Sequence, residues 1–158
     1  MPLPYFQITG GNRLRGTVRI SGAKNASLPI MAAVLLCEGE VILHDVPVVA
    51  DVKSLCELLT KLGVDIERRA DGALRLNVRD EMNFRAEYDI VRKMRASICV
   101  LGPLLAKRHN AQVSMPGGCA IGDRPVDIHL RAMKRLGAEI DLVSGDIIAK
   151  AKRLRGCE

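Results

Sequence analysis

A cysteine set between paired glycines and an arginine is the feature of this chain best suited to chemistry. The segment runs Met115-Pro116-Gly117-Gly118-Cys119-Ala120-Ile121-Gly122-Asp123-Arg124-Pro125. Glycines allow a sharp turn and let the backbone approach a ligand closely. A thiol becomes reactive when it is partly exposed in electropositive surroundings, and Arg124 supplies positive charge. Cys119 is therefore a candidate catalytic residue, although a free cysteine at a strand end is commonly a small packing residue.

A second polar segment, Ser21-Gly22-Ala23-Lys24-Asn25-Ala26-Ser27, leads from an expected strand into an apolar run. The run predicts a helix, so Lys24 and Asn25 lie at a helix N-terminus. Free N–H groups and the helix dipole favour an anion there. Two simpler interpretations stay open: Lys24 as a solvated lysine and Asn25 as an N-cap.

The elements around these segments recur along the chain. Arg13-Leu14-Arg15-Gly16 returns as residues 153–156, and Lys61-Leu62-Gly63-Val64-Asp65-Ile66 resembles residues 135–140. Ala26-Ser27 recurs as Ala96-Ser97, which sets Arg95 at the place of Asn25. A fixed period of about 70 residues indicates a repeat architecture.

The first unit is expected to begin with a helix over Asn25–Leu36, apolar on nearly every side and therefore buried, with Pro29 in its first turn. A strand at Glu40–Leu43 and an amphipathic helix over Asp51–Leu62 follow. Gly63 ends this second helix in the left-handed conformation.

The second helix should bury one face, which carries Val52, Leu55, Leu59 and Leu62. Asp71-Gly72 then predicts a hairpin turn between two strands. The remaining expected elements are the strands Asp65–Glu67 and Ala73–Asn77, then in the second unit the helix Ile90–Ala106, the strand Ala111–Met115, the helix Val126–Leu136 and the strands Glu139–Leu142 and Ile147–Ala151. The predicted fold class is α/β, with helices buried between small sheets.

The composition sets limits on the class of protein. The chain has 158 residues, of which 48% are hydrophobic, enough to bury one core. The N-terminus shows no secretory leader, and the longest apolar run, Ala26–Leu36, is shorter than the about 20 residues that span a bilayer. Five cysteines without a Cys-x-x-Cys pair predict neither disulfides nor zinc, and His44, His109 and His129 lack metal-ligand spacing. We expect a cytoplasmic protein without a cofactor or metal.

The net charge of +6 suggests an anionic partner, either a metabolite or a nucleic acid, or a solvated basic face. Aromatic residues make up only 3% of the chain, which disfavours stacking on single-stranded nucleic acid. Residues 117–124 lack the Gly-Lys-Ser/Thr ending of a P-loop.

Taken together, three motifs resemble the UDP-N-acetylglucosamine 1-carboxyvinyltransferase family of enolpyruvyl transferases. They are Ser21-Gly-Ala-Lys-Asn-Ala, Met94-Arg-Ala-Ser with Leu101-Gly-Pro-Leu, and Pro116-Gly-Gly-Cys-Ala-Ile-Gly with Arg124-Pro-Val-Asp-x-His. The resemblance implies an inside-out α/β barrel in two lobes, each of three repeats. Residues 1–20 would form a strand that pairs with the other lobe, 21–152 two repeats, and 153–158 the start of a truncated third.

The resemblance also implies the chemistry. The family transfers the enolpyruvyl group from phosphoenolpyruvate to the 3-hydroxyl of UDP-N-acetylglucosamine, the first committed step of peptidoglycan synthesis. Cys119 would be the proton donor and the target of fosfomycin, and Lys24, Asn25 and Arg124 would bind phosphoenolpyruvate. The residues implied in UDP-N-acetylglucosamine binding are Arg95, Arg124, Pro125, Val126, Asp127 and Ile128.

The same resemblance makes the rest of the enzyme, the missing lobe, a partner of this chain, and predicts that the chain is inactive alone. The alternatives are a non-catalytic remnant that binds the UDP-sugar or a partner and, less favoured, a basic nucleic-acid-binding domain. One tension stays open at Cys119, because nearby cations favour the thiolate whereas a proton donor must be a thiol.

Overall fold

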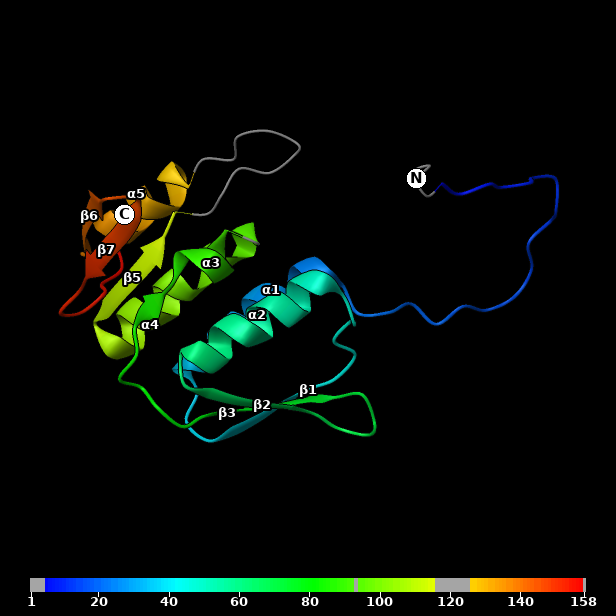
Figure 1. The fold of residues 1–158 in the computed structure, drawn as a ribbon, viewed down its shortest axis with the longest axis horizontal. Helices are drawn as coiled ribbons and strands as arrows, with labels where there is room; N and C mark the ends of the chain where they lie inside the picture. Colours follow the sequence, from blue (N-terminus) through cyan, green and yellow to red (C-terminus); the bar gives the residue numbers. More distant parts are fainter. Residues whose placement is uncertain (1–4, 93, 116–125, 158) are drawn as a thin grey trace.

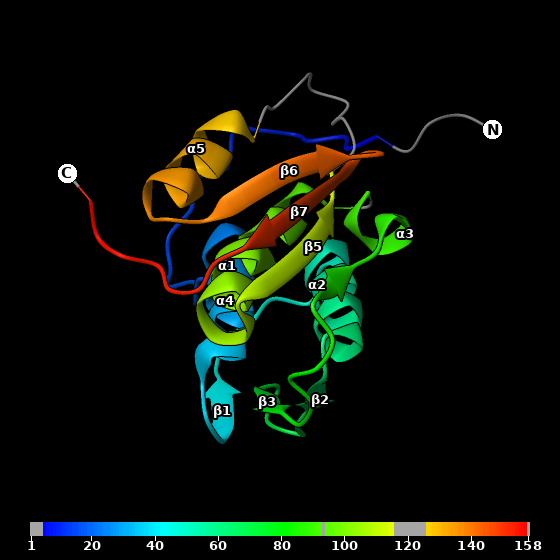
Figure 2. The same cartoon turned by 90° about the vertical axis from the view of Figure 1, so that its left-hand side faces the viewer.

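The computed structural model describes residues 5–92, 94–115 and 126–157. The helices between residues 24 and 108 lie in the middle of the molecule, with two small sheets on opposite sides of them (Figures 1 and 2). The helix Asp127–Arg135 lies at the edge and has no buried residue, so the predicted burial between sheets is wrong for this helix. The first unit contains α1 (Lys24–Ala33), the 3₁₀ turn η1 (Val34–Leu36), β1 (Glu40–Leu43), α2 (Ala50–Lys61), β2 (Val64–Arg68) and β3 (Leu74–Val78). The second contains β4 (Arg85–Ala86), α3 (Tyr88–Val91), η2 (Arg95–Val100), α4 (Leu101–Arg108), β5 (Asn110–Ser114), α5 (Asp127–Arg135), β6 (Glu139–Val143) and β7 (Asp146–Lys150).

The two sheets share one topology. In the first sheet the order is β1-β3-β2, and every pair is antiparallel, with Val41 opposite Leu76 and Ile66 opposite the same residue. In the second sheet the order is β4-β5-β7-β6, where β5-β7-β6 repeats the antiparallel arrangement and β4 adds in parallel. The α/β class is confirmed.

The second helix of each unit ends in the same way. Gly63 follows α2 with φ +85° and Gly137 follows α5 with φ +100°, both in the left-handed region that favours glycine. Their backbone N–H groups donate to Thr60 and Lys134 over 3.0 Å each. The predicted left-handed end at Gly63 is confirmed, and its counterpart 74 residues later has the same hydrogen bond.

Two buried serines also correspond. The hydroxyl of Ser27 donates to the Ala23 carbonyl over 2.9 Å, and that of Ser97 donates to the Met94 carbonyl over 2.7 Å. Each serine thereby ties its helix to the residue at which that helix begins. The repeated Ala-Ser pair therefore marks a shared local structure.

The core is formed by leucine-rich helix faces. All four residues predicted on the buried face of α2, Val52, Leu55, Leu59 and Leu62, are at most 2% exposed. Removing a fully buried leucine side chain from water contributes roughly 1.5–3 kcal/mol. These side chains join residues of both units in one cluster that includes Leu35, Leu101, Leu105 and Ile147.

The single helix predicted over Ile90–Ala106 is wrong. The chain instead forms α3, an extended residue at Met94 (φ −152°, ψ +119°), η2 and then α4. Pro103 has no backbone N–H, and this arrangement places it in the first turn of α4, where helices tolerate proline.

The prediction for the first helix needs two corrections. Because α1 begins at Lys24, Pro29 lies in its second turn rather than its first, and it has no N–H to donate to the Asn25 carbonyl. The helix is also not buried on every side, since Ile30 is 52% exposed and Leu36, in η1, is 45% exposed. Burial is restricted to the face that meets α2 and η2.

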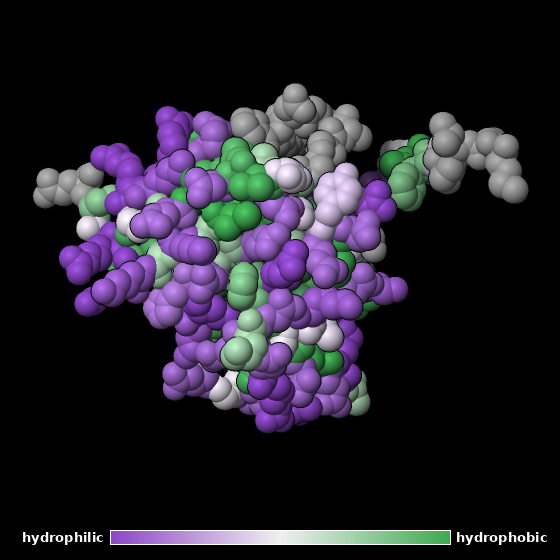
Figure 3. Space-filling view, turned by 60° about the vertical axis from the view of Figure 1, so that its left-hand side comes forward, coloured by the Kyte–Doolittle hydropathy of each residue, from purple (hydrophilic) through white to green (hydrophobic). Residues whose placement is uncertain are grey.

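Residues 5–22 form an extended arm with no helix or strand. Its apolar side chains stand clear of the body (Figure 3), and the large ones are more than 80% exposed: Tyr5, Phe6, Ile8, Leu14, Val18 and Ile20. The pairing of this arm with another lobe stays a prediction. In the described part of the chain, no helix has the length and apolar character needed to cross a bilayer.

A single arginine holds the end of the first unit to the second. Arg108, the last residue of α4, donates to the carbonyls of Leu62 (2.8 Å), Asp80 (3.2 Å) and Asn83. These carbonyls belong to the segment that follows α2 and to the link between the two sheets. Arg108 thus satisfies backbone acceptors at the seam between the units.

Candidate functional site

The predicted anion-binding residues lie at the beginning of α1. Ala23 is the extended N-cap, so Lys24 and Asn25 are the first two helical residues and both are exposed. The N-cap interpretation of Asn25 is therefore wrong, because its position is inside the helix. No carboxylate lies in the first turn of α1, so the helix dipole there is open to an external anion.

The Lys24 ammonium has a partner that the sequence did not suggest. Its Nζ donates to Oδ2 of Asp51 over 2.6 Å, and Asp51 lies in the first turn of α2. Figure 1 shows α1 and α2 side by side with their beginnings at the same end of the molecule. Two helix N-termini and one lysine therefore gather at this end.

Arg95, which the repeat aligns with Asn25, lies at the beginning of η2 in the second unit. It is exposed and is the first residue of η2, which packs against α1. The structure thus brings the element that begins at Arg95 next to the one that begins at Lys24. Arg95 also lowers the pKa of Cys99, although burial of that thiol has the larger, opposite effect.

Three further predicted residues lie at the beginning of α5. Val126 is 5% exposed and packs in the core, so any contact between it and a substrate involves its backbone. Asp127 is exposed and pairs with Arg131 over 3.2 Å, one turn further along α5. Ile128 is 71% exposed, although it is apolar.

Cys119, Arg124 and Pro125 lie outside the described residues, and their roles stay predictions. The structure does define the ends that flank their segment. Met115 N–H donates to the Gly145 carbonyl over 2.8 Å, and α5 begins at Asp127.

The strand that leads to this segment has a half-buried polar anchor. Asp146, at the start of β7, accepts from the Ser114 hydroxyl at 2.6 Å and from the Gln112 amide at 2.7 Å. These two hydrogen bonds lower the pKa of the Asp146 carboxyl. Asp146 therefore fixes β5 at its end, and neither it nor Asp51 was marked by any motif.

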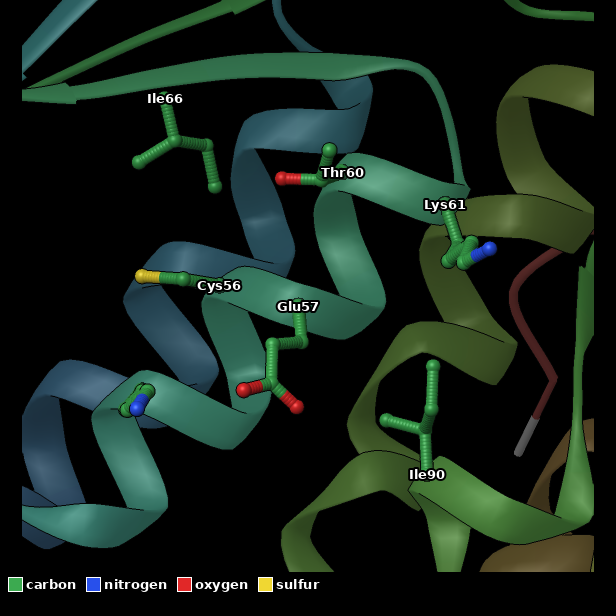
Figure 4. A pocket seen from close by; sticks show the side chains of 7 residues that line it. Cys56, Glu57, Thr60, Lys61, Ile66 and Ile90 are labelled. Atoms are coloured by element: carbon green, nitrogen blue, oxygen red, sulfur yellow. The ribbon is translucent and has the colours of Figure 1, made fainter.

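A cavity of about 450 Å³ lies elsewhere, between α2, β2 and α3 (Figure 4). Ile66, Ile90 and Cys56 give it an apolar lining, and Lys53 and Lys61 stand beside it. None of the predicted site residues lines it. Among the described residues, no group of His, Cys, Asp and Glu could hold a metal ion.

Comparison with known proteins decides the family. The model of the EPSP synthase family (3-phosphoshikimate 1-carboxyvinyltransferase) matches residues 8–158. The chain belongs to this family. Among solved structures, the enolpyruvyl transferase NikO from Streptomyces tendae is similar with a TM-score of 0.76 and 25% identity over 94% of the chain and 32% of its own length. The EPSP synthase from Acinetobacter baumannii shares the fold, with a TM-score of 0.64 at 16% identity over 90% of the chain and 33% of its own length.

Within the family, curated relatives about 50% identical to the chain are named UDP-N-acetylglucosamine 1-carboxyvinyltransferase. The relative from Helicobacter hepaticus is 53% identical over 95% of the chain, and that from Psychrobacter arcticus is 49% identical over 99%. The chain spans 36% and 37% of the length of these two relatives. The predicted resemblance and the enolpyruvyl transferase fold are confirmed.

Proposed function

We propose that this chain supplies part of one lobe of an enzyme that transfers the enolpyruvyl group from phosphoenolpyruvate to the 3-hydroxyl of UDP-N-acetylglucosamine, in the cytoplasm. The observation that carries the proposal is the exposure of Lys24 and Arg95 at the beginnings of two packed elements, α1 and η2. Both lie in a chain about 50% identical to relatives named for that reaction.

The reaction is an addition followed by an elimination. The sugar hydroxyl oxygen adds to C2 of phosphoenolpyruvate and gives its proton to a carboxylate of the other lobe, while the Cys119 thiol protonates C3 and becomes a thiolate. In the elimination a base takes a proton from C3, phosphate leaves C2 with the electron pair of the C–O bond, and the double bond forms again. The developing negative charges need cations that are already in position, because preorganised donors stabilise a transition state without further reorganisation.

Each remaining residue has a binding role in this proposal. Lys24 and Arg124 hold the phosphate and carboxylate of phosphoenolpyruvate, where charge-assisted hydrogen bonds are strong. Asn25 orients the tetrahedral intermediate. Arg95 and the segment 124–128 contact the UDP-sugar, and Val126 does so through its backbone because its side chain is buried.

The missing lobe completes the proposed site. The exposed apolar arm of residues 5–22 and the 36% coverage of the relatives support a surface that pairs with further parts of the enzyme. A contiguous set of exposed apolar side chains commonly marks an interaction site.

Calorimetric titration of the purified chain with UDP-N-acetylglucosamine tests the substrate assignment. We expect binding that Arg95→Ala weakens about tenfold, the loss typical of a charge-assisted contact. Arg79→Ala is the matched control, because Arg79 is an exposed arginine paired with Asp65 in the first sheet. Binding of a random oligonucleotide without binding of the nucleotide sugar would contradict the proposal.

A further inference from the structure

The ion pair between Lys24 and Asp51 joins two helices at the candidate site. Lys24 Nζ and Asp51 Oδ2 lie 2.6 Å apart, and the two side chains are 46% and 34% exposed. A pair that is this accessible gains little stability from its charges, since solvent screens them. Its geometry, rather than its contribution to folding, is therefore the informative property.

The sequence repeat does not reproduce the two charged residues. The 70-residue period aligns Lys24 with Met94, and the 74-residue spacing of the following helices aligns Asp51 with Pro125. At the aligned positions, the lysine and the aspartate are therefore specific to the first unit.

Asp51 restricts where the lysine ammonium can go. A lysine side chain is flexible and has three N–H donors on a compact charge. With one donor directed at Asp51, the other two remain for a ligand at the beginnings of α1 and α2. Helix N-termini present free N–H groups and positive potential to an anion. The carboxylate thus holds the cation at the place where two helix dipoles favour negative charge.

We propose that Asp51 is a positioning residue, which holds the Lys24 ammonium ready for the phosphate or carboxylate of phosphoenolpyruvate. This inference rests on the proposed function. In this proposal Asp51 does not contact the substrate, so Asp51 affects substrate binding only through Lys24. A purely structural alternative exists, because an acid in the first turn of α2 also stabilises that helix.

A double-mutant cycle separates these roles. Phosphoenolpyruvate is titrated into the wild-type chain, Asp51→Asn, Lys24→Met and the double variant, with UDP-N-acetylglucosamine absent and present. We expect Asp51→Asn to weaken binding about fivefold in the wild-type background, as loss of one ion pair allows. In the Lys24→Met background, the same substitution should change the dissociation constant less than twofold.

Glu38→Gln is the matched control, because Lys107 and Glu38 form a second lysine–carboxylate pair, 2.9 Å apart, that joins α4 to the start of the first sheet. It should leave binding unchanged. Circular dichroism of each variant checks that α2 is retained.

The outcomes are distinct. Unchanged or tighter binding by Asp51→Asn, or an equal loss in both backgrounds, would overturn the positioning role and leave the proposed function intact. No binding of phosphoenolpyruvate by the wild-type chain would overturn the assignment of this substrate and the inference with it.

Discussion

For residues at the candidate site, the sequence predicts position in a helix but not tertiary contacts or burial. The apolar run after Asn25 was enough to place Lys24 and Asn25 at a helix beginning, since a helix dipole depends only on local structure. Asp51 was missed because its contact with Lys24 spans 27 residues and depends on how two helices pack. The buried side chain of Val126 was missed for the same reason, since a sequence pattern at the start of a helix does not show which residues the rest of the fold covers.

At this scale we predict that Cys119 is the most reactive thiol. Burial raises the pKa of Cys56 and of Cys99, which reduces their thiolate fractions. Cys37 is half-buried, whereas Cys157 is exposed and is the main competitor. Limiting iodoacetamide followed by peptide mass mapping measures the order of labelling. Modification of Cys37, Cys56 or Cys99 before Cys119 would contradict the prediction.

Asp146 should make the stability of the chain depend on acid pH. Its folded-state pKa is lowered by hydrogen bonds from Ser114 and Gln112, so the ionised form stabilises the folded state. This contribution is present above the unfolded pKa, near 4, and is lost as the pH falls through the lower folded value. Asp146→Asn should therefore destabilise the chain in urea at pH 7 and destabilise it less at pH 2. An equal loss at both pH values would contradict this assignment.

At the scale of elements, prediction worked where a local signal was decisive. The strand Glu40–Leu43 and the left-handed end at Gly63 match the structure. The helix expected over Ile90–Ala106 is broken instead, because its hydrophobic pattern does not reveal the extended residue Met94. Hydrophobic periodicity shows which residues are buried but not whether the backbone is continuous between them.

Two glycines with the same backbone angle allow a matched test at this scale. Gly63 and Gly72 both have φ +85°, but a Cβ on Gly63 would lie 2.0 Å from the Asp80 carbonyl oxygen, whereas nothing lies within 4 Å of one on Gly72. Gly72→Ala should cost about 1 kcal/mol for the left-handed backbone alone. Gly63→Ala should cost about 3 kcal/mol or more, because the carbonyl must also move. Equal shifts in urea midpoint would contradict the predicted contact.

At the scale of the whole molecule, the repeat was the strongest guide. Two units with the same sheet topology follow from motifs 70–140 residues apart. How the arm of residues 5–22 is covered was not predictable from the described chain, since its apolar residues contact nothing that would bury them.

We predict no measurable transferase activity for this chain alone. In the proposed site, cations at α1 and η2 would supply one wall, and the family resemblance implies that another lobe would supply the opposing wall. Loss of one preorganised donor costs about 100- to 1000-fold in rate, so loss of a wall should cost more. A phosphate-release assay with both substrates measures this. Turnover that Cys119→Ala abolishes would show that the chain suffices.

The hydrogen bonds that Arg108 donates to three carbonyls affect partial unfolding of the chain at the seam between the two units. Separating the two units would break the hydrogen bonds from Arg108 to the Leu62, Asp80 and Asn83 carbonyls, and hydrogen bonds to a charged group contribute more than neutral ones. Local fraying at the seam is therefore disfavoured relative to loss of the whole fold. The Arg79 and Asp80 amides, which both donate to the Gly63 carbonyl, should exchange with deuterium as slowly as amides in the core. In hydrogen exchange the chain would then behave as one cooperative unit, although its sequence consists of two repeats.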